Sequence, residues 1–103
     1  MPTMSQLSDQ EVLASQMRLP QHVVHRSFVA ETVVLNLRTG KYHGLNPTAG
    51  RMLEALAAAP TAAATVEELA REYGVEPAKV ESDLIVLCRG LLERGLIEIA
   101  DSA

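Results

Sequence analysis

Residues 32–47 carry the sequence TVVLNLRTGKYHGLNP, and this stretch decides the fold class. Two runs rich in β-branched and aliphatic residues, 32–37 and 42–45, have the composition of strands. The link between them contains Gly40, which can adopt a positive φ, and it has the length of a hairpin turn. The stretch therefore predicts two antiparallel strands joined by a tight turn.

A further strand is predicted over residues 22–29, where β-branched residues recur before the hairpin. Only the short link Ala30–Glu31 separates it from strand 32–37, so the two strands are expected to pair antiparallel. The sheet is then a three-stranded meander with 32–37 in the middle and 42–45 at an edge.

Three helices are predicted after the sheet, over residues 47–59, 65–73 and 77–94. Asn46 before Pro47 is typical of a helix start, and Thr65 opens a Thr-Val-Glu-Glu sequence of the capping-box form. Gly95 lies just past the third helix as a left-handed C-cap. The predicted fold class is α+β and winged-helix-like: a three-stranded antiparallel β-meander followed by a three-helix bundle.

The two ends of the chain are expected to lie outside the domain. Residues 1–20 have only scattered apolar side chains and end at a proline, so we expect a flexible N-terminal arm with one helical turn at most. The folded domain then spans 21–99, and 100–103 form a C-terminal tail. Residues 96–99 form either a short strand or a docking tail.

Composition limits the functional class. The chain has 103 residues and a net charge of −4, which allows one core and disfavours nucleic acid and anionic lipid as partners. No stretch approaches the roughly 20 apolar residues that cross a bilayer. Cys88 is the single cysteine, so no internal disulfide can form, and we expect a cytoplasmic protein.

Catalytic chemistry has little support in the sequence. His22 and His25 are three residues apart in a predicted strand, so they point to opposite faces and do not share a metal ion. Cys88 lies in the apolar stripe of the third helix and is predicted to be an inert packing residue. No phosphate loop or hydrolase motif occurs. We expect no catalytic residue, no cofactor and no metal.

The edge strand 42–45 is the candidate binding surface. It has neither the proline nor the inward charge that proteins use to block edge pairing, and Gly44 lets another backbone approach closely. A helix with an apolar stripe beside that edge would make a groove for an added peptide strand. The alternative is that the tail or a second copy of the chain covers the edge.

A winged-helix DNA-binding regulator is the alternative class. The third helix would be its recognition helix, but its charges cancel: Lys79, Arg89 and Arg94 against Glu81, Asp83 and Glu93. A helix that enters the major groove presents basic and amide side chains at its exposed N-terminal end. The sequence therefore disfavours this reading.

Five segments carry a family likeness: the run 19–23 (LPQHV), the hairpin 34–42 (VLNLRTGKY), the junction 44–49 (GLNPTA), and the two helical segments 80–84 (VESDL) and 91–97 (LLERGLI). Together they resemble the PqqD-like proteins, also called RiPP recognition elements. The resemblance spans about residues 19–99, almost the whole predicted domain. It rests on several spaced patterns in the same order.

The resemblance implies non-catalytic capture of the leader segment of a ribosomally synthesised precursor peptide. The leader would be added as a strand to 42–45, with its side chains beside the third helix. Carried over position by position, the implied peptide-binding residues are Tyr42, His43, Gly44 and Leu45 on the strand and Val80, Asp83, Leu84 and Leu87 on the helix. Leu84→Arg or Leu45→Asp would then abolish capture with the fold intact.

Within the family, the hairpin and the junction are similar to the stand-alone forms of lasso-peptide clusters. That likeness implies three partners: the precursor leader, a leader peptidase of the cysteine-protease type and, indirectly, a cyclase. The alternative is a pyrroloquinoline quinone-type peptide chaperone that acts with a radical S-adenosylmethionine enzyme. A homodimer through the open strand edge is a further alternative when no leader is present.

Overall fold

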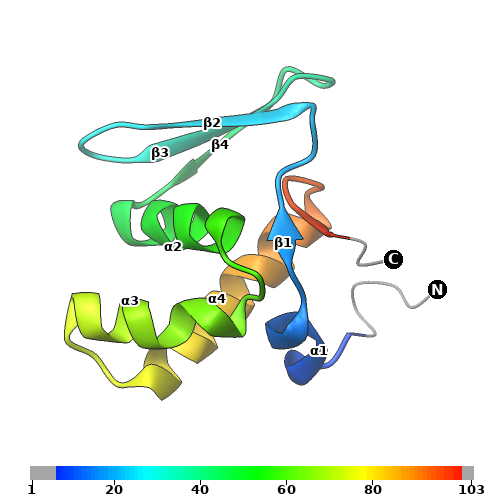
Figure 1. Cartoon of the computed structure of the whole chain (residues 1–103). Coiled ribbons are helices and arrows are strands. Elements are labelled where there is room, and N and C mark those ends of the chain that lie inside the picture. The colour runs from blue at the N-terminus through cyan, green and yellow to red at the C-terminus, as the bar shows by residue number, and fades with distance from the viewer. Residues whose placement is uncertain (1–6, 101–103) are drawn as a thin grey trace.

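The computed structural model describes residues 7–100 (Figure 1). A three-stranded sheet comes first among the main elements: β2 (Val23–Ser27), β3 (Thr32–Asn36) and β4 (Tyr42–Leu45). Helices follow: α2 (Pro47–Ala58), the 3-10 helix η2 (Ala63–Thr65), α3 (Val66–Tyr73) and α4 (Pro77–Glu93). The strands pair antiparallel in the order β2-β3-β4, so the predicted α+β meander followed by three helices is confirmed.

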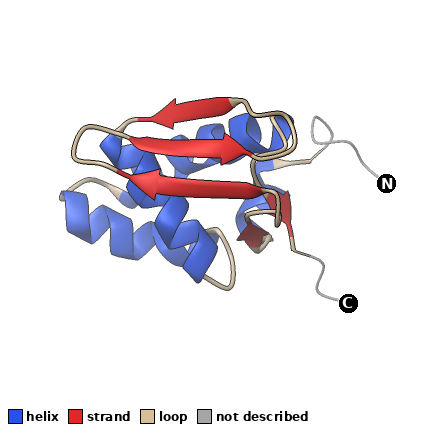
Figure 2. Cartoon of the chain, turned by 90° about the horizontal axis from the view of Figure 1, so that it is seen from above, coloured by secondary structure: helices blue, strands red, loops and turns tan. Residues whose placement is uncertain are grey.

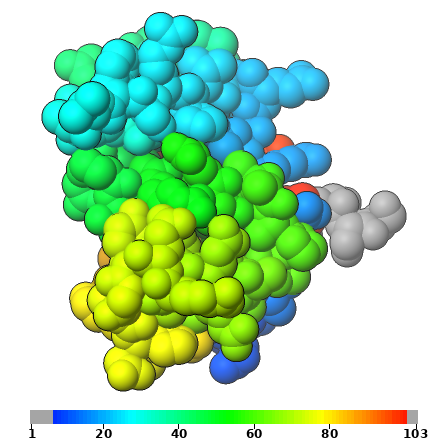
Figure 3. Space-filling model, turned by 60° about the vertical axis from the view of Figure 1, so that its left-hand side comes forward, coloured from blue at the N-terminus to red at the C-terminus, as the bar shows by residue number. Residues whose placement is uncertain are grey.

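The sheet and the helices form stacked layers. Viewed from above, the three strands lie side by side over the helices (Figure 2). From the side, the sheet lies above α2, and α3 lies below α2 (Figure 3). His43 pairs with Val34 and Leu45 with Thr32, so alternate residues of β4 face the helical layer. The other face of the sheet carries no helix in the described part of the chain (Figure 1).

A glycine lets α2 approach the sheet closely. Gly50 is buried in α2, and a Cβ at this position would overlap the side chain of Thr32 on β3. Thr32 is itself buried, and its hydroxyl lies 3.1 Å from the Ser27 hydroxyl on the neighbouring strand. The sheet therefore packs directly on α2, and this contact fixes the position of β4 relative to the other helices.

The N-terminal segment is part of the fold, so the expected flexible arm is wrong for residues 7–20. Helix α1 (Asp9–Ala14) begins with a capping box between Ser8 and Glu11. Val12 and Met17 are 0% and 1% exposed, which anchors the segment in the core. The apolar residues of this segment look scattered in the sequence, but in the structure they pack together against the core. Because they are packed in this way, the segment is not the separate arm that was expected. Residues 1–6 lie outside the described part.

The C-terminal segment pairs with the N-terminal one. Strand β5 (Glu98–Ile99) is antiparallel to β1 (Met17–Arg18), and Arg18 forms an ion pair of 2.8 Å with Glu98. The Ala100 amide donates to the Gln16 carbonyl at 2.7 Å, which continues the pairing. The strand alternative is therefore confirmed for Glu98–Ile99, whereas Leu96 and Ile97 form a bend before the strand. Of the expected tail, residues 101–103 lie outside the described part.

The helix boundaries follow local chemistry with one exception. The Asn46 side chain accepts from the Ala49 amide at 2.8 Å and caps α2, as expected. Thr65 does not form the expected capping box at the start of α3. Its hydroxyl instead donates to the Ala62 carbonyl at 2.8 Å, because η2 already continues into α3 and leaves no extended N-cap position.

Helix α4 supplies much of the core. Val80, Leu84, Cys88 and Leu91 are buried along one face, at the spacing of an amphipathic helix. Burial raises the pKa of the Cys88 thiol to about 12, so this thiol stays protonated and serves as a packing residue, as expected. Within residues 7–100, no helix is both long and apolar enough to cross a membrane.

Candidate functional site

Within residues 7–100, no strand pairs with the outer edge of β4, so that edge offers unpaired backbone groups. The Asn36 amide donates to the Lys41 carbonyl at 2.9 Å, which sets the phase of the hairpin ladder. Hydrogen-bonded pairs alternate along antiparallel strands, so the backbone groups of His43 and Leu45 point toward β3. Those of Tyr42 and Gly44 point to the open edge. Two N–H donors and two carbonyl acceptors are therefore available to a further strand.

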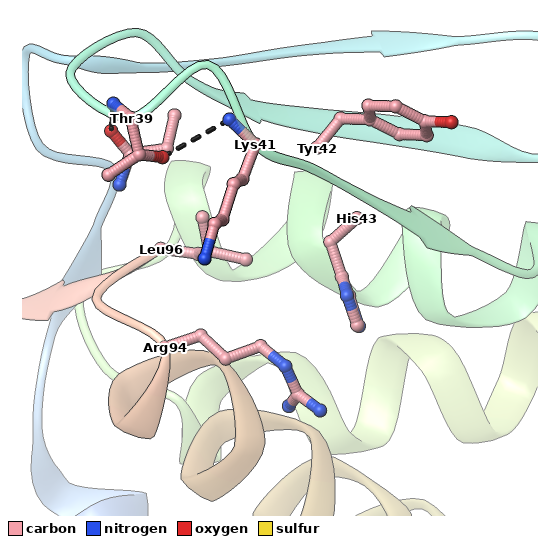
Figure 4. A pocket seen from close by; sticks show the side chains of 7 residues that line it. Thr39, Lys41, Tyr42, His43, Arg94 and Leu96 are labelled. Atoms are coloured by element: carbon pink, nitrogen blue, oxygen red, sulfur yellow. Dashed lines mark hydrogen bonds between the residues drawn. The ribbon is translucent and has the colours of Figure 1, made fainter.

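A cavity of about 390 Å³ lies next to this edge, between the β3–β4 hairpin and the C-terminal end of α4. We call it the hairpin pocket; its lining residues are Asn36, Thr39, Lys41, Tyr42, His43, Arg94 and Leu96. Lys41 and His43 extend from the hairpin toward the helix, and Arg94 extends beneath them (Figure 4). The Tyr42 ring lies on the other side of the strand, 75% exposed.

The turn after α4 positions the helix side of the hairpin pocket. Gly95 adopts φ +69°, which ends the helix in the left-handed region. The Leu96 amide donates to the Leu91 carbonyl at 2.9 Å and the Gly95 amide to the Leu92 carbonyl at 3.1 Å, the pattern of a Schellman motif. The chain therefore turns back, Leu96 packs into the core as the pocket floor, and Arg94 stays at the surface.

The hairpin turn positions the strand side. Gly40 has φ +74°, and the Asn36 side-chain oxygen accepts from the Arg38 amide at 2.9 Å. The Lys41 amide donates to the Thr39 hydroxyl at 3.1 Å, as the dashed line in Figure 4 shows. These bonds hold the turn without using the Lys41 ammonium group.

The structure separates the eight residues implied by the family resemblance into two groups. Leu45, Val80 and Leu84 are 6%, 2% and 0% exposed, so their side chains belong to the core. Leu84→Arg would place a charge in the core and is expected to unfold the domain, and Leu45→Asp is expected to do the same. This corrects the expectation that the fold of these variants stays intact.

The other five residues are accessible. Tyr42 and Gly44 are exposed on β4, and His43 is half-buried on the face toward the helices. Asp83 is exposed on α4 and forms an ion pair of 3.1 Å with Lys79, and Leu87 is half-buried at the core boundary. These five are the candidates for direct contact with a ligand.

Sequence reasoning missed five residues of the hairpin pocket: Asn36, Thr39, Lys41, Arg94 and Leu96. A signal was present, since the hairpin turn and the Gly95 C-cap were both predicted. What local pattern does not show is that the hairpin and the end of α4, more than fifty residues apart, border the same cavity.

The residues 7–100 contain no group of three or more His, Cys, Asp or Glu side chains that could hold a metal ion. His25 pairs with Val34 in the strand ladder, and Val34 pairs on its other side with His43. These two histidines are thus separated by the middle strand. The site consists of backbone edge, cations and apolar floor, a combination suited to binding a peptide.

Comparison with known proteins agrees with this geometry. A small α+β domain with an open strand edge beside a helix is the class that the fold defines. The family model described as "Coenzyme PQQ synthesis protein D (PqqD)" matches residues 31–97, more than half of the chain. The chain therefore belongs to the PqqD family, as its sequence resemblance implied.

Two solved structures are similar over 82% of this chain and 99% of their own length. One is "Lasso peptide synthetase B1 complexed with the leader peptide", with a TM-score of 0.74 and 28% identity. The other is "TbiB1 in Complex with the TbiA(beta) Leader Peptide", with a TM-score of 0.72 and 32% identity. No curated protein matches the sequence.

Proposed function

We propose that this protein binds the leader segment of a ribosomally synthesised precursor peptide, of the lasso type, as a fourth strand on β4. One observation carries the proposal: the outward N–H and C=O groups of Tyr42 and Gly44 lie at an open edge beside a pocket. Its support from the comparisons is that two proteins of the same fold are described in complex with leader peptides.

The side of α4 next to its core face is the second wall of the proposed site. Asp83, Leu87, Gly90 and Arg94 follow each other at the spacing of one helical face, and Arg94 lines the hairpin pocket. Leu87 offers an apolar contact at this wall. Leu45, Val80 and Leu84 are buried behind these two walls. Their role is to pack in the core and so to fix the positions of β4 and α4.

Binding would serve catalysis by other proteins. A leader held on β4 raises the effective concentration of its attached core peptide at a partner's active site. The partner we propose is a leader peptidase of the cysteine-protease type. The protein itself supplies affinity and no catalytic group, and its single, buried cysteine fits a reducing, cytoplasmic setting.

The expected affinity follows from the cost of ordering the leader. A short disordered segment loses conformational entropy when it becomes a strand, and a few backbone bonds plus one or two anchored side chains must exceed that loss. We expect a dissociation constant of roughly nanomolar to micromolar, about −8 to −12 kcal/mol.

The test uses fluorescence anisotropy with the intact protein. The probes are labelled leader peptides encoded by short open reading frames beside its gene, with a scrambled leader and a random DNA duplex as controls. Submicromolar binding of one leader alone supports the proposal. Binding to the duplex alone supports the winged-helix regulator, and binding to neither overturns leader capture.

A second measurement tests the strand geometry and leaves the protein unchanged. Methyl groups are placed on the backbone nitrogens of the bound leader, one position at a time. Antiparallel and parallel strands alternate their bonding direction, so every second position should lose about tenfold or more in affinity, and the positions between should not. Uniform tolerance of methylation would overturn strand addition.

A further inference from the structure

Among the described residues, the lining of the hairpin pocket contains the cations Lys41 and Arg94 and no acidic side chain. Lys41 and His43 lie on the hairpin wall of the pocket, and Arg94 lies on the opposite, helix wall (Figure 4). The Glu31 carboxylate does lie against β4, where it covers Gly44. Gly44 pairs with Val33 and points to the face opposite that of His43. Glu31 therefore does not neutralise the pocket.

Neither cation of the pocket forms an ion pair among the described residues. The ion pairs among the described residues join Arg18 to Glu98, Arg51 to Glu68 and Glu72, Lys79 to Asp83, and Arg89 to Asp9. Neither Lys41 nor Arg94 takes part in these pairs. The Arg94 guanidinium donates one hydrogen bond to the Gly90 carbonyl, at 3.2 Å, and has further donors to offer.

This positive charge is local. Residues 18–45 hold four Arg or Lys, all three histidines and one acidic residue, whereas residues 46–100 hold five Arg or Lys and nine acidic residues. Arg94 thus belongs to the acidic segment 46–100, but it lines a pocket together with residues of the basic segment 18–45. Two like charges that face one cavity repel each other, and an anion between them would relieve that repulsion.

An added strand would deliver such an anion to a defined place. Successive side chains of a strand alternate between the two faces of the sheet. A leader residue on the His43 face would point toward the hairpin pocket, and its two neighbours would point to the other face, where Tyr42 and Glu31 lie. Asp83 lies eleven residues before Arg94, about 16 Å along the helix axis, too far to compete.

We propose that the hairpin pocket binds one acidic side chain, Asp or Glu, of the strand-added leader, held between Lys41 and Arg94. This inference rests on the proposed function and adds to it a rule of sequence selection. A carboxylate accepts paired hydrogen bonds from a guanidinium, so Arg94 supplies direction as well as charge. The pocket then fixes the register of the leader along β4.

The test is a double-mutant cycle on the leader that binds in the anisotropy assay. Each Asp or Glu of that leader is changed to its amide, and the protein is changed to Lys41→Gln or Arg94→Gln. One leader position should lose about fivefold to tenfold in affinity, and each protein variant should lose a similar factor. Combining the leader change with a protein change should cause little further loss, because the same contact is removed twice.

The matched control is Arg71→Gln, which removes the same charge from an exposed cation of α3 outside the hairpin pocket. It should change affinity less than twofold. All three substitutions are at exposed positions, and unchanged melting temperatures would verify their folds.

The outcomes distinguish the two proposals. A leader that binds with submicromolar affinity but contains no acidic residue overturns this inference alone. So does additive loss in the cycle, or an Arg71→Gln effect equal to that of Arg94→Gln. A protein that binds no leader overturns the proposed function, and this inference with it.

Discussion

One face of α4 packs into the core along the length of the helix, whereas Arg94, the residue that follows the helix, lines the hairpin pocket. Val80 and Leu84 are buried, and the charges nearby, Lys79 and Asp83, form an ion pair of 3.1 Å. At the other end, Arg94 is in none of the ion pairs of the described residues and faces the hairpin pocket. The spacing of apolar residues thus identifies the side chains that pack in the core. The candidate binding surface lies where polar groups have no ion-pair partner in the fold.

The largest expected effect is on the buried face of α4. Leu84 is 0% exposed, so Leu84→Ala should lower the free energy of unfolding by about 2–5 kcal/mol, through lost transfer energy and a residual cavity. Urea unfolding followed by circular dichroism measures it. Leu87→Ala, on the half-buried face of the same helix, is the control and should cost less than half as much. Equal losses would mean that the two faces do not differ as the structure shows.

Cys88 gives a pH-dependent test of the same core. Burial raises the pKa of its thiol from about 9 to about 12, so above pH 9 the unfolded chain loses a proton that the folded chain keeps. The contribution of the protonated thiol to the free energy of unfolding is thus fully present below pH 9. It falls as the pH rises toward 12, by about 1.4 kcal/mol per pH unit at most. Cys88→Ala should lack this part of the decline, as measured by urea unfolding at pH 8 to 11. Identical slopes in both proteins would contradict a buried thiol.

A substitution at Gly95 tests the turn that ends α4 next to the hairpin pocket. Its φ of +69° disfavours any residue with a Cβ, so Gly95→Ala should cost about 1 kcal/mol in stability. Gly90→Ala is the matched control. Gly90 lies inside α4 without a positive φ, and a Cβ there meets only the Arg94 guanidinium, at 3.4 Å.

Gly90→Ala should therefore stabilise the domain, by about 0.5–1 kcal/mol. Thermal unfolding of the two variants checks both signs. A stabilising Gly95→Ala would show that the Schellman turn is not required.

The smallest effect is expected for the exposed ion pair at the start of α4. Asp83→Asn removes the partner of Lys79, four residues earlier on the helix, and should cost about 0.3–0.5 kcal/mol at low salt. The loss should disappear near 1 M salt, where such charges are screened. A large loss that persists in high salt would show that Asp83 has a structural role beyond this pair.

Elements with strong local signals were predicted well. The β2-β3-β4 meander, the Asn46 cap of α2 and the Gly95 end of α4 each depend on residues close together in sequence. The capping box at Thr65 failed because the preceding 3-10 turn, a context outside the motif, changed the backbone at that residue.

The β1–β5 pairing could not be predicted. Each strand has two residues, too few for a recognisable alternation, and Met17 pairs with Ile99 at the other end of the chain. The same reason explains the missed half of the candidate site. Polar residues in a turn and at a helix end carry no periodic signal, so nothing local distinguishes Lys41 or Arg94 from other surface cations.

The sequence by itself determined the α+β class, the edge position of β4 and the family, because hairpin chemistry, helical periodicity and caps act over a few neighbouring residues. Only the tertiary structure decided which candidate residues are core and which are accessible. It also decided that the hairpin and the end of α4 border one positively charged pocket. Burial and cavities depend on how distant elements stack, which no local pattern encodes.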